Sequence, residues 1–356
     1  MKKRMTGAEI LLESLIAEGV DTLFGYPGGQ ILTVYDKLYD YSDRLNHVLV
    51  RHEQGAIHAA QGYARATSRP GVVMVTSGPG ATNVITGVAD SMIDSTPVIV
   101  IAGQVGTALL GSDAFQETDV VGMTRPIDKW TFQIRRAEDV APAVAKAFHI
   151  ATTGRPGPVV LDFTRDAQVG EAEFEYRKCS SMRSYVPEKE ISAEAVEVAA
   201  KLIDEAERPL VVYGQGVLLS HAEKQLQDFL KKGGIPAAST LLGLSALPSD
   251  FPYYLGMAGM HGNIAANMMT QRCDVLVAVG MRFDDRVTGK VSEYARQAKV
   301  IHIDIDETEI GKIIPVEVGI VGDAAKVLEM LTARIRSAIN TTEPLRMDTR
   351  TRFLPS

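Results

Sequence analysis

Runs of largely apolar residues alternate along the first half of the chain with segments of helical periodicity. Thr6 begins the first helical segment, Glu9 follows it as in a capping box, and Gly19 ends the segment. The strand-like runs are DTLF, HVLV, VVMVTS, VIVIAG and VVLDF, which start at residues 21, 47, 72, 98 and 159. Because these runs do not alternate with polar residues, they predict strands covered on both faces, as in a parallel sheet between two layers of helices.

A second alternation of the same kind begins at Ser192, the predicted N-cap of a helix that runs to Ala206. Its strand-like runs are PLVVYG, IPAAST, VLVAVG and VIHIDID. The pattern predicts an α/β protein of two consecutive domains, each a mostly parallel sheet with helices on both faces. The predicted bounds are residues 1–168 and 191–335, with a charged, nonperiodic linker at 169–190 and a nonperiodic tail at 336–356.

The composition excludes some classes of protein without changing this fold. The 356 residues are 46% hydrophobic and 23% charged, which is typical of a folded globular protein. A formal net charge of −7, with no basic patch, argues against a nucleic-acid partner. Cys179 and Cys273 are far apart and lack metal-type spacing, so we expect a reducing compartment, the cytoplasm. No apolar run is long enough to span a membrane, and we expect no membrane partner.

Two glycine-rich loops follow predicted strands of the first domain and precede helices. GYPGGQ occupies residues 25–30 and SGPGATN occupies residues 77–83. Glycine lets a ligand approach the backbone at a helix N-terminus, although a tight turn and a capped helix start explain the two segments equally well. Two such loops at one sheet edge favour a binding site, because open α/β sheets bind ligands at the carboxyl ends of their strands.

Glu53 follows the run HVLV and therefore lies at the same predicted edge. Apolar strand ends and small neighbours should partly desolvate its carboxylate, which would let it hold or share a proton near neutral pH. A solvated glutamate at the start of a helix is the equally weighted alternative. His52 and His58 are close in sequence, but their spacing puts them on different helical faces, so we expect no metal site there.

Polar segments also follow the strands of the second domain. YGQG, from residue 213, resembles a dinucleotide fingerprint only weakly, because leucine replaces its third glycine. GMHG, GMRFDDRVTGK and HIDIDETEIGK each follow or end a strand. They carry arginines suited to phosphates and aspartates suited to ribose or ribityl hydroxyls, namely Arg282, Arg286, Asp304 and Asp306. Surface ion pairing among Asp284, Asp285 and Arg286 is the alternative.

Taken together, these motifs resemble one enzyme family. FGYPGG, VRHEQGAIHAAQGYARAT, VTSGPGATN, IAGQV, GSDAFQETD and TGRPGPVVLDF are similar to the amino-terminal domain of acetolactate synthase large catalytic subunits. ASTLLGL, GMAGMHG, GMRFDDRVTGK and HIDIDETEIGK are similar to the middle domain, in the same order. The resemblance covers about residues 5–330. It implies a thiamine-diphosphate enzyme whose first domain binds the pyrimidine ring and whose Rossmann-like middle domain binds FAD.

The resemblance also implies roles for individual residues. Glu53 would hydrogen-bond the aminopyrimidine ring and so promote removal of the C2 proton of the thiazolium. The other implied active-site residues are Gly28, Pro79, Asn83, Phe115 and Gln116. The implied FAD-binding residues are Arg155, Gln215, Thr240, Leu241, Met260, His261, Gly280, Arg282, Asp284, Arg286, Asp304, Ile305 and Asp323. Gln215 departs from the glycine that is common in the family.

The implied reaction is the decarboxylating condensation of two pyruvates to 2-acetolactate, or of pyruvate with 2-oxobutanoate to 2-aceto-2-hydroxybutanoate, in valine, leucine and isoleucine biosynthesis. The family works as a homodimer or higher oligomer, and its Mg²⁺ site belongs to a third domain with a GDG motif. This chain has no GDG and ends at Ser356, so we expect a truncated catalytic subunit whose tail begins the linker to that domain. An inert FAD-binding or assembly fragment is the alternative. The sequence does not decide whether a small regulatory subunit binds.

Overall fold

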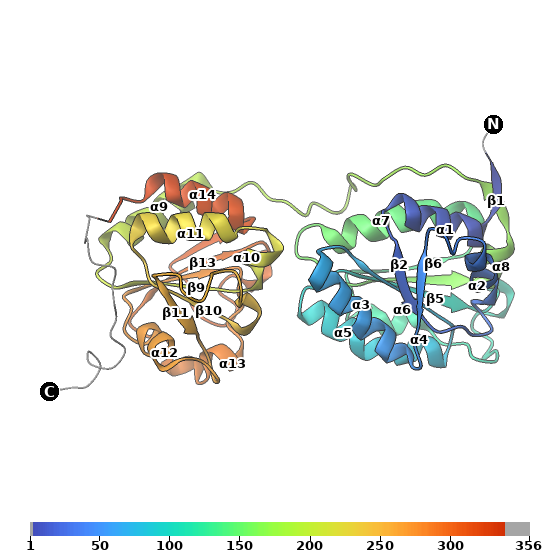
Figure 1. Cartoon of the computed structure of the whole chain (residues 1–356), viewed down its shortest axis with the longest axis horizontal. Helices are drawn as coiled ribbons and strands as arrows, with labels where there is room; N and C mark the ends of the chain where they lie inside the picture. The colour runs from blue at the N-terminus through green and yellow to red at the C-terminus, as the bar shows by residue number, and fades with distance from the viewer. Residues whose placement is uncertain (1–2, 339–356) are drawn as a thin grey trace. The chain divides into compact units, whose positions relative to one another are not determined.

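The computed structural model describes residues 3–338, which form two compact units (Figure 1). The first unit ends at Pro187 and the second begins at Glu188. Each contains one six-stranded sheet in which all neighbouring strands are parallel, so the predicted α/β class is confirmed. Most of the predicted tail, residues 339–356, lies outside the described residues. None of the described helices is both long and apolar enough to cross a membrane.

The sheet of the first unit has the strand order β3-β2-β4-β5-β7-β6, and a separate pair joins β1 to β8. Its strands are β1 (Arg4–Thr6), β2 (Thr22–Gly25), β3 (Asn46–Leu49), β4 (Gly71–Val75), β5 (Val98–Gln104), β6 (Trp130–Ile134), β7 (Val159–Thr164) and β8 (Glu171–Glu173). Its α-helices are α1 (Gly7–Ala17), α2 (Leu32–Tyr39), α3 (Glu53–Thr67), α4 (Pro79–Asn83), α5 (Ile85–Ile93), α6 (Val120–Thr124), α7 (Val140–Thr152) and α8 (Arg165–Val169). Short 3₁₀ turns are η1 (Thr107–Leu109) and η2 (Ala137–Asp139).

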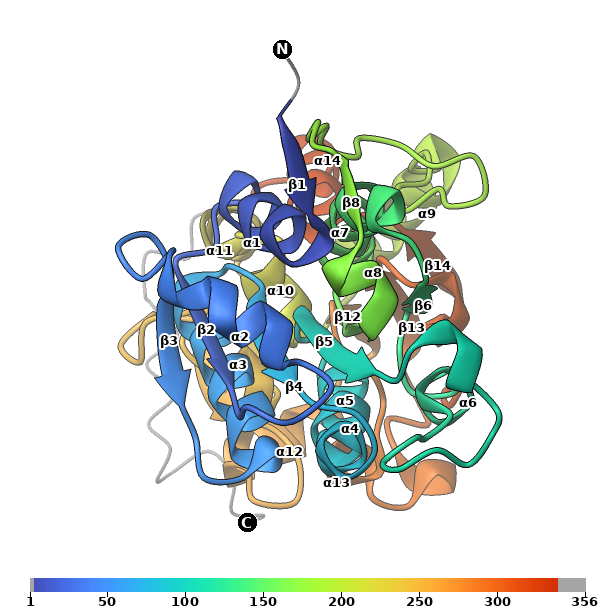
Figure 2. The ribbon, with the colours of Figure 1, turned by 90° about the vertical axis from the view of Figure 1, so that its right-hand side faces the viewer.

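Helices cover both faces of this sheet, as Figure 2 shows for the first unit. Helices α1, α2, α7 and α8 contribute to the core on one face, and α3, α5 and α6 contribute to the core on the other. Alternate residues of β4 enter the two cores: Val72 and Met74 lie in the first, Val73 and Val75 in the second. The uninterrupted apolar run therefore has the predicted physical cause, because both faces of the strand are buried.

Local signals place the helix start as predicted, whereas the position of one strand differs from the prediction. The capping box is confirmed, since Thr6 N donates to Glu9 Oε2 at 2.9 Å and Glu9 N to Thr6 Oγ1 at 3.3 Å. The run HVLV does form β3, but β3 is an edge strand and Leu49 is 64% exposed. The prediction that this strand is covered on both faces is wrong, because an apolar run does not reveal strand order.

The segment after β7 adds a strand to the first unit. Within the predicted linker at 169–190, β8 pairs antiparallel with β1. Phe174 and Tyr176 then pack against the first core. These residues are therefore held by the first unit rather than left as a free connection.

The sheet of the second unit has the order β11-β10-β9-β12-β13-β14. Its strands are β9 (Pro209–Tyr213), β10 (Ala237–Ser239), β11 (Tyr254–Met257), β12 (Val275–Val279), β13 (Lys299–Asp304) and β14 (Val318–Val321). Its α-helices are α9 (Ala193–Glu205), α10 (Gln215–Leu219), α11 (Glu223–Gly233), α12 (Ile264–Thr270), α13 (Asp285–Thr288) and α14 (Ala324–Arg334). Short 3₁₀ turns are η3 (Leu241–Gly243), η4 (Val291–Glu293) and η5 (Glu307–Glu309). The order reverses between β9 and β12, as in doubly wound sheets that bind nucleotides.

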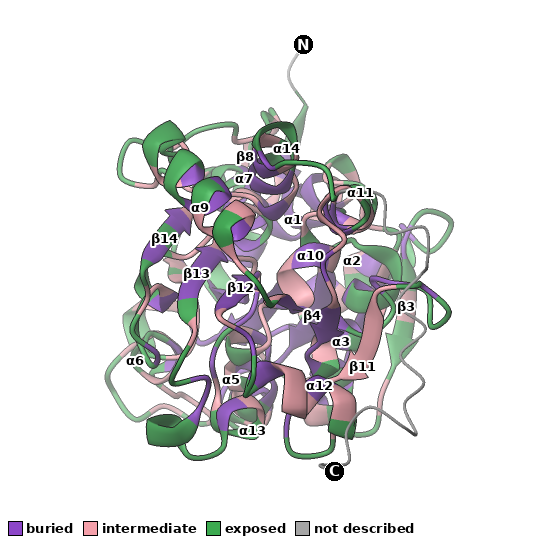
Figure 3. Cartoon of the chain, turned by 90° about the vertical axis from the view of Figure 1, so that its left-hand side faces the viewer, coloured by how far each residue is buried: buried purple, intermediate pink, exposed green. Residues whose placement is uncertain are grey.

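Two layers also enclose this second sheet. Helices α9, α11 and α14 pack on one face, and α13 with the segment 281–295 packs on the other. Figure 3 shows β12 as buried and much of the surface of α9 as exposed. The predicted N-cap of α9 is confirmed, because Ser192 Oγ accepts a hydrogen bond from Ala195 N at 3.2 Å. Helices thus cover both faces of each sheet, and the carboxyl ends of the strands carry the loops with the candidate residues.

Candidate cofactor sites

Glu53 is an enclosed carboxylate at the carboxyl edge of the first sheet. It is the first residue of α3, and only 8% of its surface is exposed. Asn83 Nδ2 donates a hydrogen bond to Glu53 Oε2 at 2.8 Å. His52 is the N-cap of α3, where its Nδ1 accepts from Gln54 N at 3.1 Å. The solvated glutamate considered as an alternative is thus not what the fold produces.

Two glycines pack closely against Thr76, and one of them, Gly80, also lies beside this carboxylate. A Cβ on Gly80 would lie 3.4 Å from Glu53 Oε1 and 2.7 Å from Thr76 Cγ2. A Cβ on Gly28 would lie 2.5 Å from the same Thr76 atom. Thr76 Oγ1 also accepts from Gln30 N at 3.2 Å, which joins the loops after β2 and β4. Thr76 is not among the residues predicted from sequence, although its place directly after β4 is a usable signal.

The loop after β5 passes over the loop after β4. Gln116 has a positive φ of 59°, and a Cβ on Gly78 would lie 2.5 Å from the Gln116 carbonyl oxygen. Gly78 itself has φ of 53°, so glycine relieves both the crowding and the backbone strain there. The neighbouring Phe115 is 83% exposed. The fold therefore brings Gln116 to the loop that carries Pro79 and Asn83, while the side chain of Phe115 is largely accessible.

Tyr35 is a second residue that sequence analysis missed. Its hydroxyl donates to the Met74 carbonyl at 3.1 Å and lies 3.2 Å from His47 Nε2. Burial, with a smaller effect of the Glu53 charge, raises the pKa of Tyr35 above its ordinary value. Burial also lowers the pKa of His47. Glu53 thus has a protonated phenol nearby, which no motif in the sequence indicates.

A buried carboxyl group supports the loop after β5. Gln104 Nε2 donates to the Thr118 carbonyl at 3.0 Å, and Gln104 Oε1 accepts from Val105 N at 2.9 Å. Behind it, Asp162 Oδ2 accepts from Gln133 Nε2 at 2.7 Å and lies 3.4 Å from Gln104 Nε2. Asp162 is fully buried, and burial raises its pKa to about 6.

We expect Asp162 to make stability depend on pH. Because its folded-state pKa of about 6 lies above the reference value of 3.8, its contribution is fully present below about pH 4 and is lost as pH rises through 6. Asp162→Asn keeps an acceptor for the glutamines and removes the charge. Urea unfolding at pH 7.5 should show a gain of up to about 3 kcal/mol over the wild type, with little change at pH 4.

The matched control for this prediction is Asp128→Asn. Burial also raises the pKa of Asp128 to about 6, so the control measures the part of the pH dependence that belongs to that second carboxyl. An unchanged slope between pH 4 and 7.5 in Asp162→Asn would show that Asp162 does not titrate in this window.

In the second unit, the predicted FAD-binding residues share one location: they follow the carboxyl ends of the strands. Gln215 follows β9, Thr240 and Leu241 follow β10, Met260 and His261 follow β11, Gly280, Arg282, Asp284 and Arg286 follow β12, Asp304 and Ile305 end or follow β13, and Asp323 follows β14. The one predicted member outside this edge is Arg155, which belongs to the first unit.

Backbones touch where the strand order of the second sheet reverses. Gly216 N donates to the Gly280 carbonyl at 2.9 Å. A Cβ on Gly280, whose φ is 54°, would lie 2.6 Å from Gly216 Cα. A Cβ on Gly214 would lie 2.5 Å from the Gly280 carbonyl oxygen. Glycine is therefore required on both sides of the point where the strand order reverses, the switch point. Gln215, between Gly214 and Gly216, lies directly beside that point.

The acidic residues of this edge bind neighbouring backbone groups. Asp284 Oδ1 accepts from Arg286 N at 2.8 Å, and Asp304 Oδ1 accepts from Asp306 N at 2.9 Å. Arg286 Nη1 also lies 3.7 Å from Asp285 Oδ2, so the surface ion pair weighed as an alternative is present. These contacts shape the loops and leave the arginine at the exposed edge.

Apolar and cationic side chains from three different loops are exposed at the same edge. Leu241 and Met260 are large exposed apolar residues. Arg282 is exposed, with its Nε 3.9 Å from Asp284 Oδ2. A ligand that combines a flat ring system with phosphates, such as FAD, matches this set of groups.

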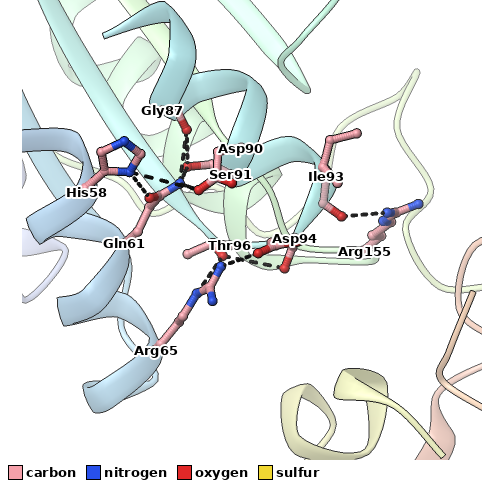
Figure 4. A network of polar contacts seen from close by, with 10 residues as sticks. All are labelled: His58, Gln61, Arg65, Gly87, Asp90, Ser91, Ile93, Asp94, Thr96 and Arg155. Carbon is pink, nitrogen blue, oxygen red and sulfur yellow. Dashed lines mark hydrogen bonds and ion pairs between the residues drawn. The ribbon is translucent and has the colours of Figure 1, made fainter. Parts of the chain in front are cut away.

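Arg155 has partners within the first unit. Its Nε donates to Ser95 Oγ at 2.9 Å. Its Nη2 donates to the Ile93 carbonyl at 3.4 Å, a contact drawn in Figure 4. Because Arg155 and the other predicted FAD-binding residues belong to different units, its role stays a prediction. Within residues 3–338, no group of three or more His, Cys, Asp or Glu side chains is arranged to hold a metal ion.

Two family comparisons match the two units separately. Residues 5–123 match the thiamine pyrophosphate enzyme N-terminal TPP binding domain, and residues 196–331 match the thiamine pyrophosphate enzyme central domain. The first match contains Glu53 and the glycine loops, and the second contains all the predicted FAD-binding residues except Arg155.

The chain is also similar to named relatives. It is 48% identical over 343 residues to the acetolactate synthase large subunit of Corynebacterium glutamicum, covering 96% of this chain and 55% of that protein. It is 49% identical over 334 residues to the probable acetolactate synthase large subunit of Methanocaldococcus jannaschii (93% and 56%) and 46% identical over 327 residues to the acetolactate synthase isozyme 2 large subunit of Escherichia coli (92% and 59%). The chain spans a little over half the length of these relatives. The resemblance seen in the motifs is confirmed, and the chain belongs to the thiamine pyrophosphate enzymes, as a homologue of acetolactate synthase large subunits.

Proposed function

We propose that this protein is an acetolactate synthase catalytic subunit that condenses two pyruvates to 2-acetolactate with loss of carbon dioxide. A second reaction, of pyruvate with 2-oxobutanoate, would give 2-aceto-2-hydroxybutanoate, a precursor of isoleucine. The first product, 2-acetolactate, is a precursor of valine and leucine. The observation that supports the proposal best is the enclosed Glu53 carboxylate, hydrogen-bonded to Asn83. Gly80 lies beside this carboxylate, and Gly28 and Gly80 both pack against Thr76. The similar relatives named above are acetolactate synthases.

Each candidate residue of the first unit would have its own role in cofactor binding or catalysis. Bound thiamine diphosphate supplies an electron sink for decarboxylation. Glu53 would bind the pyrimidine ring and hold or move its proton, and Asn83 would keep the carboxylate in place. Pro79 would contact the pyrimidine from the same loop. Gln116 would bind cofactor or substrate, and Phe115 would line the active site beside the substrate.

The second unit would bind FAD across its carboxyl edge. Arg282 and Arg286 would bind phosphates, and the exposed Leu241 and Met260 would contact the ring system. Mg²⁺ would accompany the diphosphate of the other cofactor. We further propose a cytoplasmic homodimer or higher oligomer. A small regulatory subunit is also proposed, since the relatives are called large subunits.

The purified chain tests this proposal when it is assayed with thiamine diphosphate, Mg²⁺, FAD and pyruvate. The expected result is a flavin spectrum on the protein and pyruvate consumption that requires thiamine diphosphate. Flavin binding without any turnover would favour the non-catalytic assembly module instead. Binding of neither cofactor would contradict the proposal.

A further inference from the structure

Contacts between α3 and the segment formed by α4 and α5 recur every four residues on both sides. The pairs, in order along both segments, are Glu53 with Asn83, Ile57 with Gly87, and Gln61 with Ser91. Four residues are about one helical turn, so the three pairs lie on one face of each segment. Both segments leave the carboxyl edge of the sheet, and each pair is one turn farther from the cofactor site than the pair before it.

At the middle pair, the two helices are so close that no side-chain atom fits between Gly87 and Ile57. A Cβ on Gly87 would lie 2.1 Å from Ile57 Cγ2 and 3.0 Å from its Cγ1. The side chain of Ile57 is fully buried and fills the space that glycine leaves. The helices are therefore in direct contact at this turn, and they can shift only by sliding or rotating.

At the third pair, a set of hydrogen bonds made by Gln61, here called the polar lock, opposes such a shift. Gln61 is buried, and its Nε2 lies 3.1 Å from the Gly87 carbonyl, 2.8 Å from Asp90 Oδ2 and 2.8 Å from Ser91 Oγ (Figure 4). Its Oε1 lies 2.7 Å from His58 Nδ1. Ser91 Oγ in turn donates to the Gly87 carbonyl at 2.8 Å. Only one orientation of the amide suits these partners, because its nitrogen must face the carbonyl and the carboxylate.

We propose that Gln61 is a positioning residue that sets the register of α3 on α5 and thereby the contact of Glu53 with Asn83. Gln61 and Glu53 lie on the same buried face of one 15-residue helix, about 12 Å apart along its axis. A rigid helix transmits a slide at Gln61 to Glu53, so loss of the lock loosens the hydrogen bond at the cofactor site. The consequence for the cofactor rests on the proposed function, whereas the register itself does not.

The test uses Gln61→Leu in the full chain, labelled with ¹⁵N only at asparagine. The chain has five asparagines, so the side-chain amide of Asn83 can be identified from the signal lost in Asn83→Ala. The first readout is the rate at which this amide exchanges with water, and the second is the affinity for thiamine diphosphate with Mg²⁺. In Gln61→Leu we expect about tenfold faster exchange and about tenfold weaker binding, the factor for one lost hydrogen bond.

Two further variants separate register from general stability. Leu15→Ala removes a fully buried side chain from the core on the opposite face of the sheet, so it should lower the melting temperature without changing the exchange of Asn83. Ser91→Ala removes one acceptor of Gln61 and serves if Gln61→Leu does not fold. It should change the exchange rate in the same direction by a smaller factor.

The outcomes distinguish this inference from the proposed function. Wild-type exchange of Asn83 in a folded Gln61→Leu, or in Ser91→Ala if the former does not fold, would overturn the positioning role. Faster exchange in a chain that never binds thiamine diphosphate would support the register and contradict the proposed cofactor site.

Discussion

Replacing Glu53 with glutamine is expected to abolish thiamine-diphosphate-dependent turnover of pyruvate while FAD binding stays at the wild-type level. Glutamine keeps the shape of the side chain and an acceptor for Asn83 Nδ2, which now donates to Glu53 at 2.8 Å. It cannot take up or release a proton. Because proton transfer by a placed side chain contributes roughly 10²–10⁴-fold to rate, turnover should fall by about that factor. The measurement is pyruvate consumption together with the flavin spectrum.

The control for this prediction is another glutamate of the same unit. Glu13 pairs with Arg44 at the surface, 2.9 Å away and remote from the glycine loops. Glu13→Gln should therefore leave turnover unchanged. Turnover within about twofold of the wild type in Glu53→Gln would remove Glu53 from the reaction, and a parallel loss of flavin would indicate misfolding rather than lost chemistry.

Gly280→Ala should destabilise the second unit by roughly 2–4 kcal/mol, the combined effect of a left-handed backbone and of crowding. The added methyl would lie 2.6 Å from Gly216 Cα, at the point where the strand order reverses. The loops after β9 and β12 must then move apart, and Gln215 moves with them. We therefore expect weaker FAD binding as well as a lower unfolding free energy, measured by flavin titration and by urea unfolding.

Gly311→Ala separates the two causes of this loss. Gly311 has a positive φ of 70°, but the nearest atom to an added Cβ is Val316 Cγ2 at an ordinary 3.7 Å. This variant should lose only about 1–2 kcal/mol, the cost of the left-handed backbone. It should also keep its affinity for FAD. Equal losses in the two variants would mean that the close approach at the switch point contributes nothing.

The candidate site was recoverable from sequence to different extents in the two units. Motif resemblance selected Glu53 and Asn83, which the fold joins across 30 positions by a hydrogen bond. Thr76 lies in the motif VTSGPGATN but was not singled out, and Tyr35 belongs to no motif; the importance of both follows from what lies around them. In the second unit, the predicted residues share the carboxyl edge because each follows a strand, a relation that sequence order already contains.

Local sequence alone determined two of the helix starts, the sheet type and the positions of the loops that follow the strands. The capping box of Thr6 and Glu9 and the N-cap at Ser192 each depend on residues three positions apart. A continuous apolar run such as β4 indicates a strand whose two faces are both covered by helices. Only the tertiary structure decided that β3 is an edge strand and that Gln61 contacts Ser91, two helical turns from the contact of Glu53 with Asn83. The physical reason is that strand order and helix register arise from packing between segments distant in sequence, and no local pattern encodes that packing.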